Sequence, residues 1–127
     1  MILIVDDDVE MAETCSMFLE SQGFDVSTAA NGAEALSRIR ERSHELVISD
    51  CAMPKMSGLE LSKKLRADPS TALLPILLMS ASLRCDLAQS DSYDGFLRKP
   101  FLAEALLAEV RKLLPGADGA ASLQAEV

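Results

Sequence analysis

The side chains best suited to chemistry in this chain are three acids, one hydroxyl and one amine, each placed directly after a short apolar segment. They are Asp6 and Asp7 after ILIV, Asp50 after LVIS, Ser80 after ILLM and Lys99 after GFLR. Carboxylates crowded together repel one another, so some of them must take up protons or bind a cation. A hard cation such as Mg²⁺ suits carboxylate oxygens, and it typically uses one or two carboxylates together with water and a phosphate.

The same residues could transfer a phosphoryl group. A bound cation would neutralise an approaching phosphate donor and leave one carboxylate free to attack phosphorus, and carboxylates that form aspartyl-phosphates are an established class of nucleophile. The Lys99 ammonium would pair with the new charge, and the Ser80 hydroxyl would hydrogen-bond a phosphoryl oxygen. Positioning and charge neutralisation account for most of such catalysis. Each residue alone is weak evidence, because an acid after a strand is usually a solvated turn or a helix cap.

The elements that must position these residues alternate between short apolar segments and amphipathic ones. Strands are predicted at Ile2–Val5, Phe24–Ala29, Leu46–Ser49, Ile76–Met79 and Gly95–Arg98. Helices are predicted at Asp8–Gln22, from Asn31 onward, from Ser57 to about Arg66, weakly at Leu83–Gln89, and at Leu102–Leu114. This alternation predicts an α/β protein with a parallel sheet covered on both faces. We expect a flavodoxin-like (βα)5 doubly wound sheet of order 2-1-3-4-5, in which ligands bind beyond the carboxyl ends of the strands.

Three local signals mark the ends of the predicted helices. Gly23 stands where a helix C′ residue would, just after Gln22. Asn31 with Glu34, and Ser57 with Glu60, have the spacing of a capping box, in which two side chains satisfy free backbone groups at the start of a helix. These signals place the second and third helices directly after the loops that follow Ala29 and Asp50.

Composition and charge limit the classes of function. The chain has 127 residues, 49% hydrophobic and 25% charged, a balance typical of one globular domain. Its net charge of −8 argues against direct nucleic-acid binding, because phosphate contacts need clustered Lys and Arg. Three cysteines (Cys15, Cys51 and Cys85) are an odd number at unrelated spacings. They fit neither a disulfide framework nor a zinc site, so we expect reduced thiols.

The ends of the chain and the absence of long apolar runs bear on its location. No apolar run approaches the roughly 20 residues that span a bilayer, so no membrane association is expected. The apolar opening Met1–Val5 lacks a basic n-region and a small-residue cleavage site, which predicts a cytoplasmic protein without a signal peptide. Residues 1–114 are expected to form the domain. Residues 115–127 are small and polar, and we expect a flexible tail or the start of a linker.

Four segments then identify a family. ILIVDDD, LVISDCAMPKMSG, PILLMSA and GFLRKPF resemble, in this order, the successive signatures of the response-regulator receiver domains of two-component signalling, the CheY-like superfamily. The resemblance covers roughly Met1–Leu114. It implies that Asp50 is the phosphoacceptor and that Lys99 contacts the phosphoryl group. It also implies that a histidine kinase or a histidine phosphotransfer protein is the phosphodonor, and that an unknown downstream protein reads the result.

The resemblance further implies a metal site and a switch. Mg²⁺, or Mn²⁺, would be held directly by Asp7 and Asp50, by Asp6 through water, and by the backbone carbonyl of Ala52. Two more residues are implied to form the switch, namely Ser80 as the hydroxyl residue and Phe96 as the aromatic residue that moves inward. Ala81 would leave room for the phosphoryl group, and the Lys99–Pro100 peptide bond is expected to be cis.

The resemblance has one departure and leaves alternative hypotheses. The stretch from Ser80 to Lys99 is shorter than the family's by nearly one helical turn, which predicts a short or poorly formed fourth helix and puts dimerisation through that face in doubt. The leading hypothesis is a regulatory domain that is not an enzyme beyond phosphotransfer to itself and self-dephosphorylation. A non-phosphorylated interaction module of receiver shape is the main alternative. A phosphohydrolase using Asp50 or the Asp6–Asp8 run is a further one, although no insertion is long enough for a substrate cap.

Overall fold

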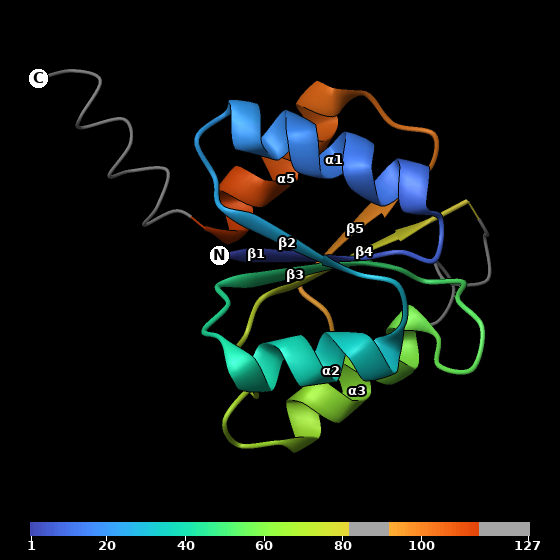
Figure 1. Ribbon diagram of the computed structural model, residues 1–127, viewed down its shortest axis with the longest axis vertical. Helices are drawn as coiled ribbons and strands as arrows, with labels where there is room; N and C mark the ends of the chain where they lie inside the picture. Colours follow the sequence, from blue (N-terminus) through green and yellow to red (C-terminus); the bar gives the residue numbers. More distant parts are fainter. Residues whose placement is uncertain (82–91, 115–127) are drawn as a thin grey trace, which may run out of the picture.

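The computed structural model describes residues 1–81 and 92–114, which form one parallel sheet between two layers of helices (Figure 1). The strands are β1 (Ile2–Val5), β2 (Val26–Ala29), β3 (Leu46–Asp50), β4 (Ile76–Ser80) and β5 (Gly95–Arg98). The helices are α1 (Val9–Ser21), α2 (Gly32–Glu41), α3 (Gly58–Ala67) and α5 (Ala103–Leu113). All neighbouring strands are parallel, in the order β2-β1-β3-β4-β5. The predicted fold class and strand order are therefore confirmed.

The sheet separates two apolar clusters. Helices α1 and α5 cover one face and α2 and α3 cover the other, as Figure 1 shows. Strand β1 contributes Ile2 and Ile4 to the first cluster and Leu3 to the second, because successive side chains of a strand point to opposite faces. Strands β1, β3 and β4 are buried along their whole length. This burial explains their continuous apolar sequences.

Side chains and one glycine fix the helix ends. Asp8 caps α1 by accepting a hydrogen bond from the Met11 backbone, and Gly23 follows that helix with a φ of 97°. Ser57 and Glu60 form the predicted capping box at α3, with both reciprocal bonds present. Asn31 caps α2 by accepting from the Glu34 backbone. For this pair the structure gives only the first half of the predicted box.

A few boundaries differ from the prediction. Strand β2 begins at Val26 rather than Phe24, because the Phe24 backbone N–H is turned back to the Leu19 carbonyl at 3.2 Å. Asp50 and Ser80 are themselves the last residues of β3 and β4. The weak helix predicted at Leu83–Gln89 and the tail at 115–127 lie outside the described residues. Within residues 1–81 and 92–114, no helix is long and apolar enough to cross a membrane.

Candidate functional site

The two-residue period of the strands gathers three charged side chains on one side of the sheet. Ile4, Ile48 and Leu97 pack into the cluster under α1 and α5. Two positions further along these three chain segments come Asp6, Asp50 and Lys99. Because the strands are parallel, their carboxyl ends meet at one edge, and the alternation aims the three side chains to the same face. Asp6, Asp50 and Lys99 therefore lie together because the strands are parallel and their side chains alternate between the two faces.

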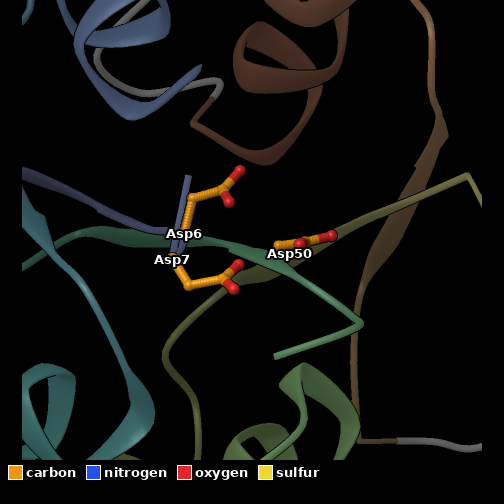
Figure 2. A group of neighbouring side chains, drawn as sticks. All are labelled: Asp6, Asp7 and Asp50. Carbon is orange, nitrogen blue, oxygen red and sulfur yellow. The ribbon is translucent and has the colours of Figure 1, made fainter. Parts of the chain in front are cut away.

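Three carboxylates crowd this edge. Figure 2 shows Asp6 and Asp7 at the end of β1 and Asp50 at the end of β3. The side chains of Asp6 and Asp7 leave the strand on opposite sides, and all three carboxylates lie at the same end of the sheet. One carboxylate oxygen of each lies within 4.8 Å of the others. Asp6 and Asp50 are buried, at 1% and 8% exposure, whereas Asp7 is exposed. The predicted acid cluster is thus assembled, with two carboxylates held away from bulk water and one open to it.

Lys99 supplies the positive charge among these acids. Its Nζ lies 3.2 Å from Asp6 Oδ2 and 3.4 Å from Asp50 Oδ1. Its backbone N–H donates to the Ser80 carbonyl at 2.9 Å, and the Lys99–Pro100 bond is cis, as predicted. Burial alone would lower the pKa of Lys99, but Asp50 and Asp6 outweigh burial and raise it above 10.5. Lys99 therefore stays charged at neutral pH and bridges the two buried acids.

The electrostatics of Asp50 are governed by competing effects. Burial raises the pKa of Asp50, the Lys99 ammonium lowers it, and the Asp6 carboxylate raises it again. A backbone hydrogen bond at Ala52 lowers it further, yet the net pKa lies above the ordinary 3.8. One ammonium thus faces three carboxylates. The surplus negative charge and the all-oxygen donor set fit a hard divalent cation.

Backbone hydrogen bonds and one close backbone contact fix the segments around the acids. The Asp8 backbone N–H donates to Asp6 Oδ1 at 2.9 Å, which fixes the Asp6 carboxylate. The Gly58 N–H donates to the Cys51 carbonyl at 2.9 Å, and a Cβ at position 58 would lie 2.3 Å from the Asp50 carbonyl oxygen. Only glycine lets α3 begin so close to the end of β3. No role was assigned to Gly58 from the sequence, although its place directly after the helix cap Ser57 was a usable signal.

The remaining predicted residues lie around this cluster. Ser80 is buried at the end of β4, two positions after Leu78, which packs under α2 and α3. Phe96 on β5 is half-buried and packs against the same cluster. By strand alternation, Ser80 and Phe96 project to the same face. Ala52 and Ala81 are exposed; Ala81 directly follows β4, and Ala52 is the second residue after β3. Their contacts with a phosphoryl group, and those of Ser80, stay predictions.

The cysteines require a correction. Cys51, which follows Asp50 and is 2% exposed, is disulfide-bonded, so the expectation of reduced thiols is wrong for this residue. Sequence spacing was a poor guide because a disulfide depends on which Cβ atoms meet in space. Cys15 is a buried free thiol, as expected, and burial raises its pKa. Cys85 lies outside the described residues.

Comparison with known proteins agrees with this geometry. The family model described as "Response regulator receiver domain" matches residues 2–111. The transcriptional regulatory protein CpxR homolog of Haemophilus influenzae is 37% identical over 113 residues, covering 89% of this chain and 49% of that protein. The crystal structure of a putative response regulator from Chloroflexus aurantiacus is 33% identical with a TM-score of 0.84, and the match covers 90% of this chain and 96% of that one.

A further solved structure bears on the metal site. The response regulator TrrA of Thermotoga maritima, solved in complex with Mg²⁺-BeF, is 36% identical with a TM-score of 0.79, covering 89% of this chain and 97% of that one. The chain spans about half the length of the curated relatives that it matches.

The matched family model, the strand order and the acid cluster with its lysine lead to one conclusion. The chain belongs to the response regulator receiver domain family.

Proposed function

We propose that this receiver domain takes a phosphoryl group from a phosphohistidine donor onto Asp50, and that the phosphorylated state is read by a partner protein. The observation that carries the proposal is the contact of Asp50 with Lys99, 3.4 Å away, within a cluster of three carboxylates. A structural role alone would call for balanced charges. The surplus of acids supports a site that is completed by a cation and a phosphoryl group.

Each residue has a defined part in the transfer. An oxygen of the Asp50 carboxylate forms a bond to phosphorus while the phosphorus–nitrogen bond of the donor breaks, and the departing imidazole keeps the electron pair and takes a proton from water. Lys99, already beside Asp50, pairs with the new phosphoryl charge. Burial raises the pKa of Asp50, and the Lys99 ammonium opposes this rise by favouring the charged carboxylate that attacks phosphorus.

Mg²⁺ or Mn²⁺ fits the donor set. Asp7 and Asp50 would bind it directly, Asp6 through water, and the Ala52 carbonyl would complete the protein ligands. The exposure of Asp7 supports this division, since a ligand that faces solvent can meet a hydrated cation, while buried Asp6 is already paired with Lys99. When bound, the metal neutralises charge on the phosphoryl oxygens. That TrrA, a similar response regulator, was solved in complex with Mg²⁺-BeF supports a Mg²⁺ site in this chain.

The output would run through Ser80 and Phe96. Phosphorylation adds about −1.5 to −2 of charge beside Ser80. The Ser80 hydroxyl would turn toward a phosphoryl oxygen, and Phe96, which packs on the same side of the sheet, would follow into the space released. The shift is a change in the populations of two packings. A partner protein would bind the altered surface near β5. The location of the protein in the cytoplasm stays a prediction.

Intact mass spectrometry tests the proposal. The protein is incubated with Mg²⁺ and phosphoramidate, beside Asp50→Asn and beside a sample with the metal chelated. We expect a gain of one phosphoryl group that is lost in both controls. No gain, under conditions that label another receiver domain, would favour the interaction module without phosphorylation. Continued turnover of a phosphomonoester would instead favour a phosphohydrolase.

A further inference from the structure

A hollow lies between α2 and α3 at the end of the sheet where the strands begin. The acid cluster lies at the other end, where the strands finish. The volume of the hollow is about 410 Å³. It is bounded by the ends of these two helices and by the loops that lead into β3 and β4, so it opens at the amino ends of the strands. The residues that line it are Leu36, Ile39, Arg40, Arg42, Ser43, His44, Lys64, Leu65, Asp68, Ser70, Thr71 and Leu74. We call this hollow the α2–α3 groove.

The groove has an apolar floor and a cationic rim. Leu36, Ile39 and Leu74 are half-buried and pack against the α2/α3 cluster, to which buried Leu65 belongs. The rim consists of exposed side chains, among them the cations Arg40, Arg42 and Lys64. Six of the twelve lining residues are exposed, so the groove is open to solvent. It resembles a surface channel rather than a closed small-molecule cavity.

Three rim cations, Arg40, Arg42 and Lys64, form no salt bridge with another residue that the structure describes. Within residues 1–81 and 92–114, none of them has a carboxylate oxygen within 4.0 Å. The acid in the lining, Asp68, accepts hydrogen bonds from the Ser70 backbone and hydroxyl, both at 2.9 Å. These bonds lower the pKa of Asp68 and hold its carboxylate within its own turn. The groove is therefore positive, in a chain whose net charge is −8.

His44 is neutral and structural in this lining. Its Nδ1 lies 3.0 Å from the Arg42 carbonyl, which can only accept, so Nδ1 carries the proton. Its Nε2 then accepts from the Ser27 hydroxyl at 3.0 Å. Burial lowers the pKa of His44, and nearby cations lower it further. The attraction for anions at neutral pH thus comes from the arginines and the lysine.

The helix dipole explains the positions of only some of these cations. Arg40 lies in the last turn of α2, where a cation stabilises the negative end of the helix dipole. Lys64 has the same place in α3. Arg42 lies beyond the last helical residue of α2, however, and also borders a second hollow of about 390 Å³ that contains Arg38. A dipole also gives no reason for an apolar floor. The two hollows share Arg42 and His44 in their linings, and the second is also bordered by Glu41.

We propose that the α2–α3 groove binds an acidic, leucine-containing segment of a partner protein. Apolar side chains of that segment would lie on the half-buried Leu36, Ile39 and Leu74, and its carboxylates would pair with the rim cations. An open groove with an apolar floor fits a peptide segment better than a compact anion, because an anion would make no use of the floor. The groove lies at the opposite edge of the sheet from Asp50, so binding should not require phosphorylation. The inference does not rest on the proposed phosphotransfer.

A titration followed by ¹⁵N–¹H NMR on the full chain tests the proposal. The probes are a synthetic peptide of Glu, Asp and Leu, a polyglutamate of equal length, and a Lys–Leu peptide of reversed charge. The Glu–Asp–Leu peptide should shift amides of the groove and leave those around Asp6 and Asp50 unmoved. Arg40→Glu with Lys64→Glu should weaken it at least about tenfold. Asp50→Asn should bind as the unmodified chain does.

Lys63→Glu is the matched control for the rim. Lys63 is an exposed residue of α3, next to Lys64 and outside the groove lining, so its replacement by Glu should leave affinity unchanged. Equal binding of polyglutamate would overturn the proposal, because the floor would then play no part. Loss of binding in Lys63→Glu or Asp50→Asn, or no binding at all, would also overturn it. Groove shifts that depend on protein concentration alone would identify a second copy as the occupant instead.

Discussion

Two charged clusters lie at opposite ends of β5, and they are balanced in different ways. Before the strand, Arg66 of α3 donates to the Leu74 carbonyl at 2.6 Å and to Asp94 Oδ2 at 2.5 Å. Asp94 Oδ2 also accepts from the Ile76 backbone at 2.8 Å. After the strand, Lys99 meets both Asp6 and Asp50, and Asp7 adds a third acid. The first cluster is neutral, whereas the second carries an uncompensated negative charge.

The difference separates a structural role from a functional one. In the Arg66 cluster each charge is paired and its hydrogen bonds reach the backbone, so the cluster ties α3 to the starts of β4 and β5. In the acid cluster, like charges are brought together at a cost in stability. Such a cost is typical of a site that binds a ligand of opposite charge. The two clusters therefore predict different responses to mutation, metal and pH.

The largest effect is expected from Lys99→Met. This change leaves buried Asp6 without its cation, and breaking a buried pair in this way should lower the free energy of unfolding by about 3 kcal/mol. Mg²⁺ should restore part of the loss, because it supplies positive charge to the same carboxylates. Urea unfolding with and without Mg²⁺ measures both quantities. A loss that Mg²⁺ does not reduce would argue that the acids do not bind the metal.

A smaller loss is expected from Arg66→Met. Removing hydrogen bonds from a charged donor to Leu74 and Asp94 should cost about 2 kcal/mol. Mg²⁺ should not restore this loss, and phosphorylation by phosphoramidate should be unchanged under native conditions. Lys63→Met, at an exposed position of the same helix, is the control for the loss of one charge and should be nearly neutral. Rescue of Arg66→Met by Mg²⁺ would remove the distinction between the clusters.

Asp50→Asn should raise stability, by about 1 kcal/mol at pH 7, because it removes one of three crowded carboxylates. The pKa of Asp50 is raised in the folded chain, so its contribution to stability is full below 3.8 and is lost as pH rises through the folded pKa. The advantage of Asp50→Asn should therefore vanish as pH falls toward 3.8. Paired unfolding curves across this range measure it, and an advantage that grows at low pH would contradict the account.

The sequence predicted the acid cluster well because its geometry follows from local rules. Parallel strands share a carboxyl edge and side chains alternate, so the positions of Asp6, Asp50 and Lys99 after three strands already imply their meeting. The strand order followed from the alternation of elements. The side-chain caps of α2 and α3, Asn31 and Ser57, were also readable, because capping bonds span only three residues.

The features that sequence reasoning missed depend on contacts between distant segments. The close approach of Gly58 to the Asp50 carbonyl needs the packed position of α3. The disulfide at Cys51 and the bond between Arg66 and Asp94, which are 28 residues apart, have no local signature. The α2–α3 groove is formed by two helices and two loops together. In each case the residues were visible in the sequence, but their neighbours were not.

Thermal unfolding with Mg²⁺ and beryllofluoride, on the unmodified chain beside Asp50→Asn, tests the central claim most directly. Beryllofluoride stands in for a phosphoryl group on a carboxylate, and a ligand that binds only the folded state stabilises it by about 2.7 kcal/mol at 100 times its Kd. We predict that Mg²⁺ and beryllofluoride together raise the Tm of the unmodified chain and leave that of Asp50→Asn unchanged. An equal rise in both proteins, or a rise in neither, would contradict the assignment of the acid cluster as the phosphoryl and metal site.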